Sequence, residues 1–392
     1  MRKITADLLF SMHANDEPLC ETVLLVADDG RIEGLAPLRE FELSAVEQYR
    51  GALVPGFVNA HCHLELSHMR GLVPTGTGLL PFIANVVQRR GAQSELIEAA
   101  IAAADAEMYA AGIVAVGDIS NAPDSFFTKI NSKIAYYTFV EFFDFMQKER
   151  AGDTFFQYKN VLDALPSNLK SAVPHAPYSV SEDLFALING LNNTLGGQRT
   201  VSIHNQETPP ENELFMHGTG DFLGFYQKFA FPIPSFLPTK NTAIHYALKN
   251  LDPRQRTLFV HNTLTSAADI AAAQAWNAQT WWATCPNANL YIENRLPNYA
   301  HFKAAGAQMC IGTDSYTSNW QLNIWAEVQT ILRHQSYLTV GEVLGWATRN
   351  GAEALGLSDN LGTFERGKTP GVVLLEGFSL TDIGSTKARR LV

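Results

Sequence analysis

Several features that define particular classes of protein are missing from this chain. It has no long run of Lys or Arg, and 29 basic against 39 acidic residues give a formal net charge of −10. This balance argues against nucleic acid and anionic membrane surfaces as partners. No apolar run approaches the roughly 18 residues that a membrane-spanning helix needs. The N-terminal segment starts with basic residues, but Thr5 and Asp7 interrupt its apolar stretch, so a secretory signal is not expected.

Cysteine is also scarce. The four cysteines lie far apart, and no two have the CxxC spacing of many metal and redox motifs. They are Cys20, Cys62, Cys285 and Cys310. We therefore expect reduced, mostly buried thiols and a cytoplasmic location.

What the chain does contain is enough apolar sequence for a large core. Hydrophobic residues make up 46% and charged residues 17% of its 392 residues, which excludes a disordered chain. Single cores stop growing near roughly 250 residues, so one large domain and a smaller one are expected.

The two ends of the chain are rich in short β-like runs. Ile4–Phe10, Thr22–Ala27 and Arg31–Leu35 alternate with turns, and Gly367–Glu376 returns to strand-like residues near the other end. Because the early strands need partners, we predict that residues 1–52 and 360–392 form one small, β-sandwich-like domain. Residues 53–359 would then be the catalytic domain.

From Leu53 onward, apolar strand-like runs alternate with helical stretches, which is typical of βα units around a parallel sheet. The runs are Leu53–Val58, Ile113–Val116, Ile134–Val140, Ala172–Pro174, Val201–Ile203, Thr257–Val260, Thr280–Ala283 and Gln308–Gly312. The clearest helices are Ser94–Ala111, Ser181–Asn192, Ser266–Ala275 and Trp320–Gln335, with Ser94 and Ser181 as expected N-caps. Eight such units predict an α/β fold, a TIM (β/α)8 barrel, with its chemistry at the carboxyl ends of the strands.

One connection, residues 205–240, is long and rich in Pro and Phe. We interpret it as a substrate-facing loop with short helices; a surface insertion without a role is the alternative.

Polar residues at the predicted strand ends suggest a metal site. His61 and His63 follow the first strand, and alternate residues of an extended chain point to the same side. His204, His261 and Asp314 follow the fifth, sixth and eighth strands. Imidazole and carboxylate ligands suit Zn or Fe(II) better than the all-oxygen sites of Ca or Mg.

A catalytic metal with an open position lowers the pKa of bound water toward about 7, and the reaction then needs a proton shuttle. Glu207, three residues after His204, could protonate a substrate nitrogen and then the leaving amine. A solvated loop acid is the alternative for Glu207.

These motifs resemble the amidohydrolase superfamily, in particular its mononuclear-metal deaminase and chlorohydrolase branch. PGFVNAHCHLE, VSIHNQE, LFVHNT and IGTDSYTSN are similar to the motifs of strands 1, 5, 6 and 8 of that family. The resemblance implies one divalent metal ion, Zn before Fe(II), held by His61, His63, His204 and Asp314. It implies that Glu207 moves protons and that His261 polarises the attacked centre. Asp314 would also accept a proton from the attacking water.

Two further positions concern the substrate. PHAPYSVS, around His175, is similar to the strand 4 segment whose histidine contacts substrate in the family's deaminases. Binuclear members carry a bridging lysine there, whereas the nearest lysine here, Lys170, lies before the strand, which favours one metal and deamination. HLELS resembles aminodeoxyfutalosine deaminase-like members, and Glu65 in it could touch substrate or brace a loop. GTGLLPF lacks the acidic residue that some nucleoside deaminases use.

The resemblance therefore implies a metal-dependent aminohydrolase that acts on a small purine-, pterin- or aminofutalosine-like amine. Hydrolysis of another C–N bond or of a C–Cl bond is the alternative within enzymes. A non-catalytic barrel scaffold is the alternative outside them, although all four ligand-type residues and Glu207 are present. A homodimer is compatible with the family.

Overall fold

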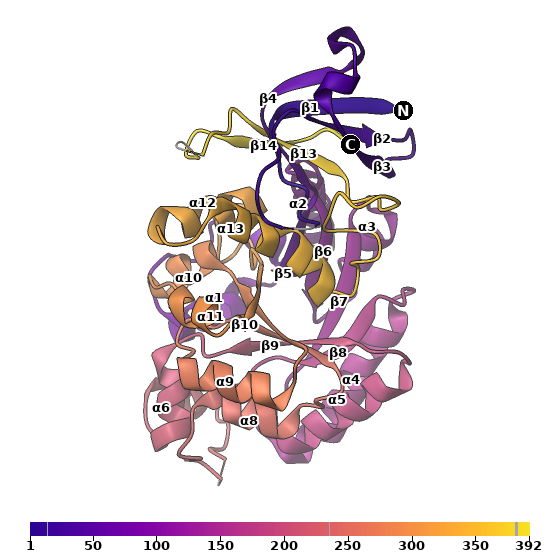
Figure 1. Cartoon of the computed structure of the whole chain (residues 1–392). Helices are drawn as coiled ribbons and strands as arrows, with labels where there is room; N and C mark the ends of the chain where they lie inside the picture. The colour runs from indigo at the N-terminus through magenta and orange to yellow at the C-terminus, as the bar shows by residue number, and fades with distance from the viewer. Residues whose placement is uncertain (14, 235, 381–382) are drawn as a thin grey trace.

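Strands from both ends of the chain lie side by side in one six-stranded sheet, at the top of Figure 1. The computed structural model describes residues 1–13, 15–234, 236–380 and 383–392. The order of the strands is β14-β13-β4-β1-β2-β3. Their bounds are β1 Arg2–Leu9, β2 Thr22–Val26, β3 Ile32–Pro37, β4 Glu47–Pro55, β13 Val372–Glu376 and β14 Lys387–Arg390. The predicted pairing of the two chain ends is confirmed by the antiparallel β13–β4 ladder.

Two details of this sheet differ from the prediction. The described strands of this region form a single sheet and not a sandwich, and the sheet is mixed because β1 pairs with β4 in parallel. The predicted strand Leu53–Val58 is in fact the end of β4 and the start of β5, divided at Gly56. The backbone NH of Gly56 donates to the carbonyl oxygen of Pro370 at 3.1 Å, and a Cβ atom at Gly56 would lie 2.5 Å from that oxygen.

Eight parallel strands follow, in two four-stranded sheets with the orders β5-β6-β7-β8 and β12-β11-β10-β9. Their bounds are β5 Phe57–Cys62, β6 Ile113–Ser120, β7 Ala135–Phe142, β8 Lys170–Pro174, β9 Thr200–Asn205, β10 Arg256–His261, β11 Thr280–Thr284 and β12 Gln308–Ile311. The α/β architecture with a parallel strand at each predicted position is therefore confirmed. The strands form two ladders and not one continuous ladder.

Helices connect these strands and close the chain (Figure 1). They are α1 Leu79–Arg89, α2 Ser94–Ala110, α3 Phe126–Asn131, α4 Ala151–Ala164, α5 Glu182–Thr194, α6 Pro209–His217, α7 Asp221–Lys228, α8 Ala243–Asn250, α9 Ala267–Trp276, α10 Pro286–Glu293, α11 Tyr299–Ala304, α12 Ile324–His334, α13 Val340–Ala347 and α14 Arg349–Ala354.

Three of the four predicted helices begin within one residue of the predicted start and one begins later, and one of the two expected N-caps is present. The Ser181 side chain caps α5 by accepting from the backbone NH of Leu184. Ser94, however, is the first residue of α2 and makes no cap. The helix predicted from Trp320 begins only at Ile324, because the Asn323 side chain accepts from two backbone NH groups of the first turn.

The two parallel sheets meet at both edges through backbone contacts. Between β8 and β9, the backbone NH of His204 donates to the carbonyl oxygen of His175 at 2.9 Å. Next to β5 and β12, the backbone NH groups of Thr313 and Asp314 both donate to the carbonyl oxygen of His61 at 3.0 Å. Each contact brings the carboxyl end of one sheet against that of the other.

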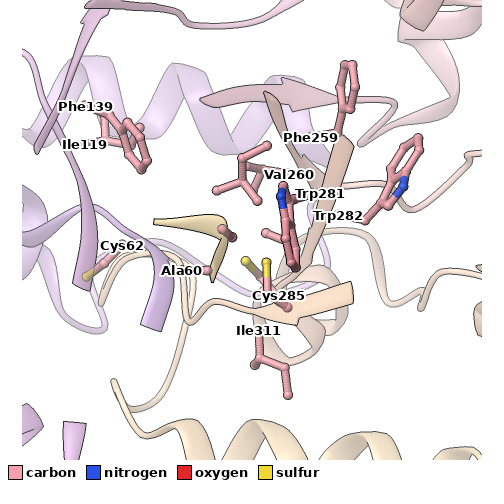
Figure 2. Close-up of a cluster of buried hydrophobic side chains, with 14 of the residues drawn as sticks. Ala60, Cys62, Ile119, Phe139, Phe259, Val260, Trp281, Trp282, Cys285 and Ile311 are labelled. Carbon is pink, nitrogen blue, oxygen red and sulfur yellow. The ribbon is translucent and has the colours of Figure 1, made fainter. Parts of the chain in front are cut away.

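The outer face of the second sheet is covered by large aromatic side chains. Figure 2 shows Trp282 of β11 beside Phe259 of β10, with ring centroids 5.2 Å apart. Phe302 of α11 meets the same indole edge-on at 5.4 Å. All three side chains are fully buried, so α11 is held on the sheet by aromatic packing.

All four cysteines are free, and three of them, Cys62, Cys285 and Cys310, are buried. This agrees with the predicted reduced thiols, and the cytoplasmic location stays a prediction. Within the described residues, no helix has the length and apolar character that crossing a membrane requires.

The edge between β5 and β12 leaves no room for a side chain at Gly312. A Cβ atom there would lie 2.8 Å from the Cβ and 2.9 Å from the carbonyl oxygen of His61. We predict that Gly312→Ala lowers the free energy of unfolding by about 1–3 kcal/mol, measured by urea denaturation. Gly190→Ala is the matched control: Gly190 is exposed in α5 with open space around it, so alanine should stabilise by about 0.5–1 kcal/mol. Equal effects of the two substitutions would contradict this account of the edge.

Candidate active site

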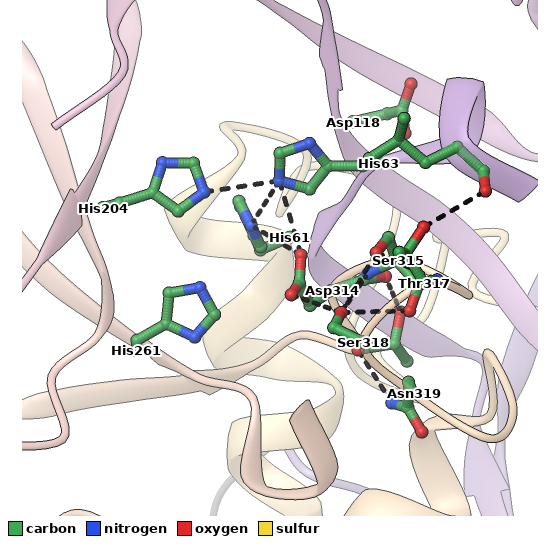
Figure 3. Close-up of polar contacts among 12 residues, drawn as sticks. His61, His63, Asp118, His204, His261, Asp314, Ser315, Thr317, Ser318 and Asn319 are labelled. Atoms are coloured by element: carbon green, nitrogen blue, oxygen red, sulfur yellow. Dashed lines mark hydrogen bonds and ion pairs between the residues drawn. The ribbon is translucent and has the colours of Figure 1, made fainter. Parts of the chain in front are cut away.

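Three imidazoles and one carboxylate from the ends of three strands, β5, β9 and β12, converge on one point (Figure 3). The Nε2 atom of His63 lies 3.2 Å from Nε2 of His61 and 3.3 Å from Nε2 of His204. Asp314 Oδ1 lies 3.4 Å from Nε2 of His63 and 3.6 Å from Nε2 of His61. The structure thus brings together four residues that the sequence predicts as metal ligands.

This geometry fits one metal ion. Four ligands placed tetrahedrally at the 2.0–2.1 Å typical of zinc are separated by about 3.4 Å from one another. The observed separations of 3.2–3.6 Å scatter around that value. Nitrogen atoms that face one another at this distance repel unless a proton or a cation lies between them. The residues can therefore hold a divalent ion.

Hydrogen bonds to the ring atoms behind this centre orient the histidines. A carbonyl oxygen can only accept, so the 2.8 Å contact between Nδ1 of His204 and the carbonyl oxygen of His175 fixes the proton on Nδ1. Asn289 does the same for His261: its Oδ1 lies 2.9 Å from Nδ1 of the ring, and its Nδ2 donates to the carbonyl oxygen of His261. Both rings consequently direct an unprotonated Nε2 into the site.

The turn that follows His63 is held by a buried ion pair. Asp118, in β6, accepts from the backbone NH of Leu64 at 2.7 Å with one carboxylate oxygen. Its other oxygen lies 2.5 Å from Nζ of Lys129. The pair fixes the start of the 3-10 helix Leu64–Met69 and so the backbone that carries His63.

Several site residues have backbone angles that are rare outside glycine. The φ angles are +70° at His261, +58° at Asn262, +58° at Asp314 and +46° at Gln206. Such conformations persist where surrounding contacts enforce them, and they gather at functional sites. Here they occur at the carboxyl ends of β9, β10 and β12.

Burial decides the charge of these groups. It lowers the pKa of His63 to about 3 and the pKa of His204 well below its usual range. Both imidazoles are thus neutral at pH 7 and keep a lone pair for a metal. Burial acts against ionisation of Asp314, but its hydrogen bond with His61 and the neighbouring histidines hold its pKa well below the usual range.

Glu207 is a buried acid beside His261. Its Oε1 lies 3.7 Å from Nε2 of that histidine. Burial, together with the nearby charges of Asp314 and Glu293, raises the pKa of Glu207 well above its usual range and so favours its protonated form. The carboxylate of Glu211 accepts from the backbone NH groups of Gln206 and Glu207 at 3.1 and 3.0 Å, which fixes this turn.

A cavity of about 340 Å³ opens above these groups. His63, His204, Glu207, His261 and Asp314 lie in its wall, together with both residues that the sequence predicts as substrate contacts, His175 and Glu65. Apolar side chains form much of the remaining lining: Leu79, Phe82, Ile83, Val86, Val87, Phe143, Phe145, Phe225, Phe229, Phe231 and Ile292. The volume and lining are those of a small-molecule site.

The segment 205–240 faces this cavity. Phe225, Phe229 and Phe231 line it, and the Phe231 ring stacks on Phe145 with centroids 4.3 Å apart. These three side chains agree with the predicted substrate-facing loop, whose role in binding stays a prediction.

Glu65 braces a loop. Its Oε2 accepts from the backbone NH groups of Asn121 and Ala122 at 2.9 and 3.3 Å. Its Oε1 lies 3.7 Å from the guanidinium of Arg90 at the cavity. Burial raises the pKa of Glu65 to about 7.

Sequence analysis missed Glu141, Asn121 and Asn289. Glu141 lies near the end of β7, within 3.4 Å of Nδ1 of His204, and lines the cavity. The rule that selected the histidines, a polar residue after a buried strand, applies equally to Glu141. Asn121 and Asn289 carry no comparable signal, because their roles depend on contacts between distant segments.

Residues 52–389 match the model of the amidohydrolase family, so the chain belongs to that family. An adenosine deaminase of Helicobacter pylori is 28% identical over 78% of this chain and 75% of its own length. A Helicobacter pylori aminofutalosine deaminase in complex with methylthio-coformycin shares the fold over the whole of both chains, with a TM-score of 0.82 and 23% identity. An atrazine chlorohydrolase of Arthrobacter aurescens, complexed with zinc, has a TM-score of 0.76 at 16% identity over 100% of this chain and 95% of its own.

The convergence of ligand atoms predicts metal binding that depends on each of them. We expect about one zinc per chain by elemental analysis, and a melting temperature raised by added zinc, because an ion bound only to the folded state stabilises it. His63→Ala should remove most of the metal and of the temperature shift. His13→Ala, an exposed histidine paired with Glu365, is the control and should change neither. Unchanged metal content in His63→Ala would rule out this site.

Proposed function

We propose that this protein is a metal-dependent hydrolase that replaces the amino group of a heteroaromatic amine by oxygen and releases ammonia. One observation carries the proposal. His61, His63, His204 and Asp314 converge at the base of a cavity of about 340 Å³, beside His261 and a buried Glu207 whose pKa is raised well above its usual range.

One divalent ion, zinc before Fe(II), would be held by His61, His63, His204 and Asp314. When bound, such an ion acts as a Lewis acid and makes water a nucleophile at neutral pH. The separations of the four ligand atoms and the neutral imidazoles support this assignment.

Asp314 and Glu207 carry out the proton transfers. Asp314 accepts a proton from the attacking water, and Ser318 Oγ holds its second oxygen at 2.5 Å. Glu207 protonates the ring nitrogen next to the attacked carbon, takes the proton of the added hydroxyl and passes it to the amino group as the C–N bond breaks; the proton on Asp314 then restores Glu207. Water and the amine thus become a carbonyl compound and ammonia. His261, whose Nε2 lies 3.7 Å from Oε1 of Glu207, would polarise the attacked centre once its Nε2 carries a proton.

A protonated Glu207 favours an amine over chloride as leaving group. Ammonia leaves only after protonation of the nitrogen, whereas chloride leaves as a stable anion and needs no acid. The named relatives also support deamination, since the adenosine deaminase matches this chain more closely than the chlorohydrolase does. A scaffold without activity would have no use for a buried acid beside four convergent ligand atoms.

The substrate would be a purine-type amine, with His175 and Glu65 among its contacts. The aromatic lining supports a flat heterocycle, and Nδ1 of His175 is held by Ser179 Oγ at 2.7 Å, which leaves Nε2 for a ligand.

We also propose how the strands divide between two domains. The two parallel sheets are the halves of a (β/α)8 barrel over residues 53–359, and residues 1–52 with 360–392 form the small domain. The backbone contacts at both sheet edges and the TM-score of 0.82 with a deaminase structure support this division.

Ammonia release gives the first test. The zinc-loaded protein should release ammonia from at least one member of a panel of adenosine, 5′-substituted adenosines, adenine, guanine and pterins, measured by a coupled assay. The absence of ammonia with every amine, together with chloride release from a chlorotriazine, would replace this proposal by its alternative.

Glu207→Gln removes the proton donor while keeping its shape. We predict a fall in kcat of about 10²- to 10⁴-fold with metal content unchanged. Because the acid must be protonated, wild-type kcat/KM should be constant below the raised pKa of Glu207 and fall as pH rises through it. Glu213→Gln, an exposed acid on α6, is the control and should retain both the rate and the pH profile. A Glu207→Gln enzyme as active as the control would exclude Glu207 as the acid.

A further inference from the structure

Two buried carboxylates joined by Asn121 form one wall of the cavity. Glu65 accepts the backbone NH of Asn121 at 2.9 Å, and the Asn121 side-chain amide donates to Glu141 Oε2 at 3.2 Å and to the Glu141 carbonyl oxygen at 3.1 Å. Neither acid takes part in the proton transfers proposed above. We refer to Glu65, Asn121 and Glu141 as the acidic wall.

One oxygen of this wall has no partner. Glu141 is 3% exposed, and its Oε1 makes no hydrogen bond. The nearest donor, Nδ1 of His204, is 3.4 Å away, but its single proton goes to the carbonyl oxygen of His175 at 2.8 Å. A buried acceptor left unpaired is costly, so this oxygen is suited to a donor brought by a ligand.

The charge of the wall limits what that ligand can be. Among the described residues that line the cavity, Arg90 is the one Lys or Arg; its guanidinium lies 3.7 Å from Glu65 Oε1, and its charge also acts on Glu141. An ionised carboxylate repels a phosphate and can only accept hydrogen bonds, and a protonated one still keeps an acceptor oxygen. A neutral group that donates, such as a hydroxyl, satisfies both conditions.

Glu141 does not lie next to the reacting atom of the substrate. Its Oε1 lies beside Nδ1 of His204, whereas the metal centre is formed by Nε2 on the other side of that ring. Glu207 and His261 would contact the reacting edge of the heterocycle. Glu141 is therefore placed to meet a substituent of the ring.

We infer that Glu141 is a specificity-determining residue whose Oε1 accepts a hydrogen bond from a sugar hydroxyl of the substrate. The inference rests on the proposed function and sharpens it: the substrate is a glycosylated heteroaromatic amine, neither the free base nor a nucleotide. Glu65 and Asn121 hold Glu141 in place for this contact.

A second metal ion, bound between Glu141, His175 and His204, is the alternative to a hydroxyl at this position. One ligand atom each from Glu141, His175 and His204 lie within 4.8 Å of one another. However, Nδ1 of His204 carries a proton held by a carbonyl oxygen, and its Nε2 belongs to the first centre. These two assignments leave His204 without a free ligand atom, which favours the hydroxyl.

The test compares the wild type with Glu141→Gln, both zinc-loaded, on adenosine, 2′-deoxyadenosine and 3′-deoxyadenosine. Binding of inosine and its two deoxy analogues, measured by calorimetry, provides a readout that needs no turnover. For the wild type we expect one of the two deoxy changes to lower kcat/KM and affinity by about 10- to 100-fold. In Glu141→Gln the same deoxy change should lower kcat/KM and affinity by less than about threefold, with the metal content unchanged. Glu213→Gln should behave as the wild type does.

Three other results overturn the inference, and a fourth separates it from the proposed function. Equal hydroxyl dependence in wild type and Glu141→Gln would show that Glu141 does not touch the sugar. Two metal ions per chain in the wild type and one in Glu141→Gln would show that Glu141 binds a second ion. Failure of the wild type to bind inosine would exclude a glycosylated substrate. Weaker inosine binding in Glu141→Gln without ammonia release from any amine would retain the subsite and reject the deaminase.

Discussion

The carbonyl oxygen of His61 accepts hydrogen bonds from the backbone NH groups of both Thr313 and Asp314, and the site depends on this contact. It joins the carboxyl end of β5 to the turn after β12 at the position where Gly312 leaves space for His61. Asp314 Oδ1 consequently comes within 3.6 Å of the Nε2 atoms of His61 and His63. The ligand set is thus made by packing two sheet edges together, and each ligand comes from a rigid strand end.

Burial gives this arrangement its chemical character. The same exclusion of water keeps His63 and His204 neutral, raises the pKa of Glu207 and leaves one oxygen of Glu141 without a partner. In each case the group is costly in the folded protein alone and becomes favourable with a cation, a leaving amine or a hydroxyl donor. Stability is given up at these positions, and aromatic packing such as that of Trp282 supports the surrounding fold.

The sequence predicted the strand ends well because buried parallel strands read as apolar runs and their polar ends stand out. His61, His63, His204, His261 and Asp314 were all identified in this way, and the structure brings them together. The same pattern joined Leu53 to Val58 in one strand, because the break at Gly56 depends on Pro370, far along the chain. The single mixed sheet, the late start of α12 and the contacts of Asn121 likewise depend on partners that no local pattern encodes.

The central claim is that one metal ion lies where the ends of β5, β9 and β12 meet. A crystal structure of the zinc-loaded protein, with anomalous differences measured at the zinc edge, tests it most directly. The account predicts one peak about 2.0–2.2 Å from the Nε2 atoms of His61, His63 and His204 and from Oδ1 of Asp314. A single peak among Glu141, His175 and His204, or no peak in a fully loaded crystal, would contradict it.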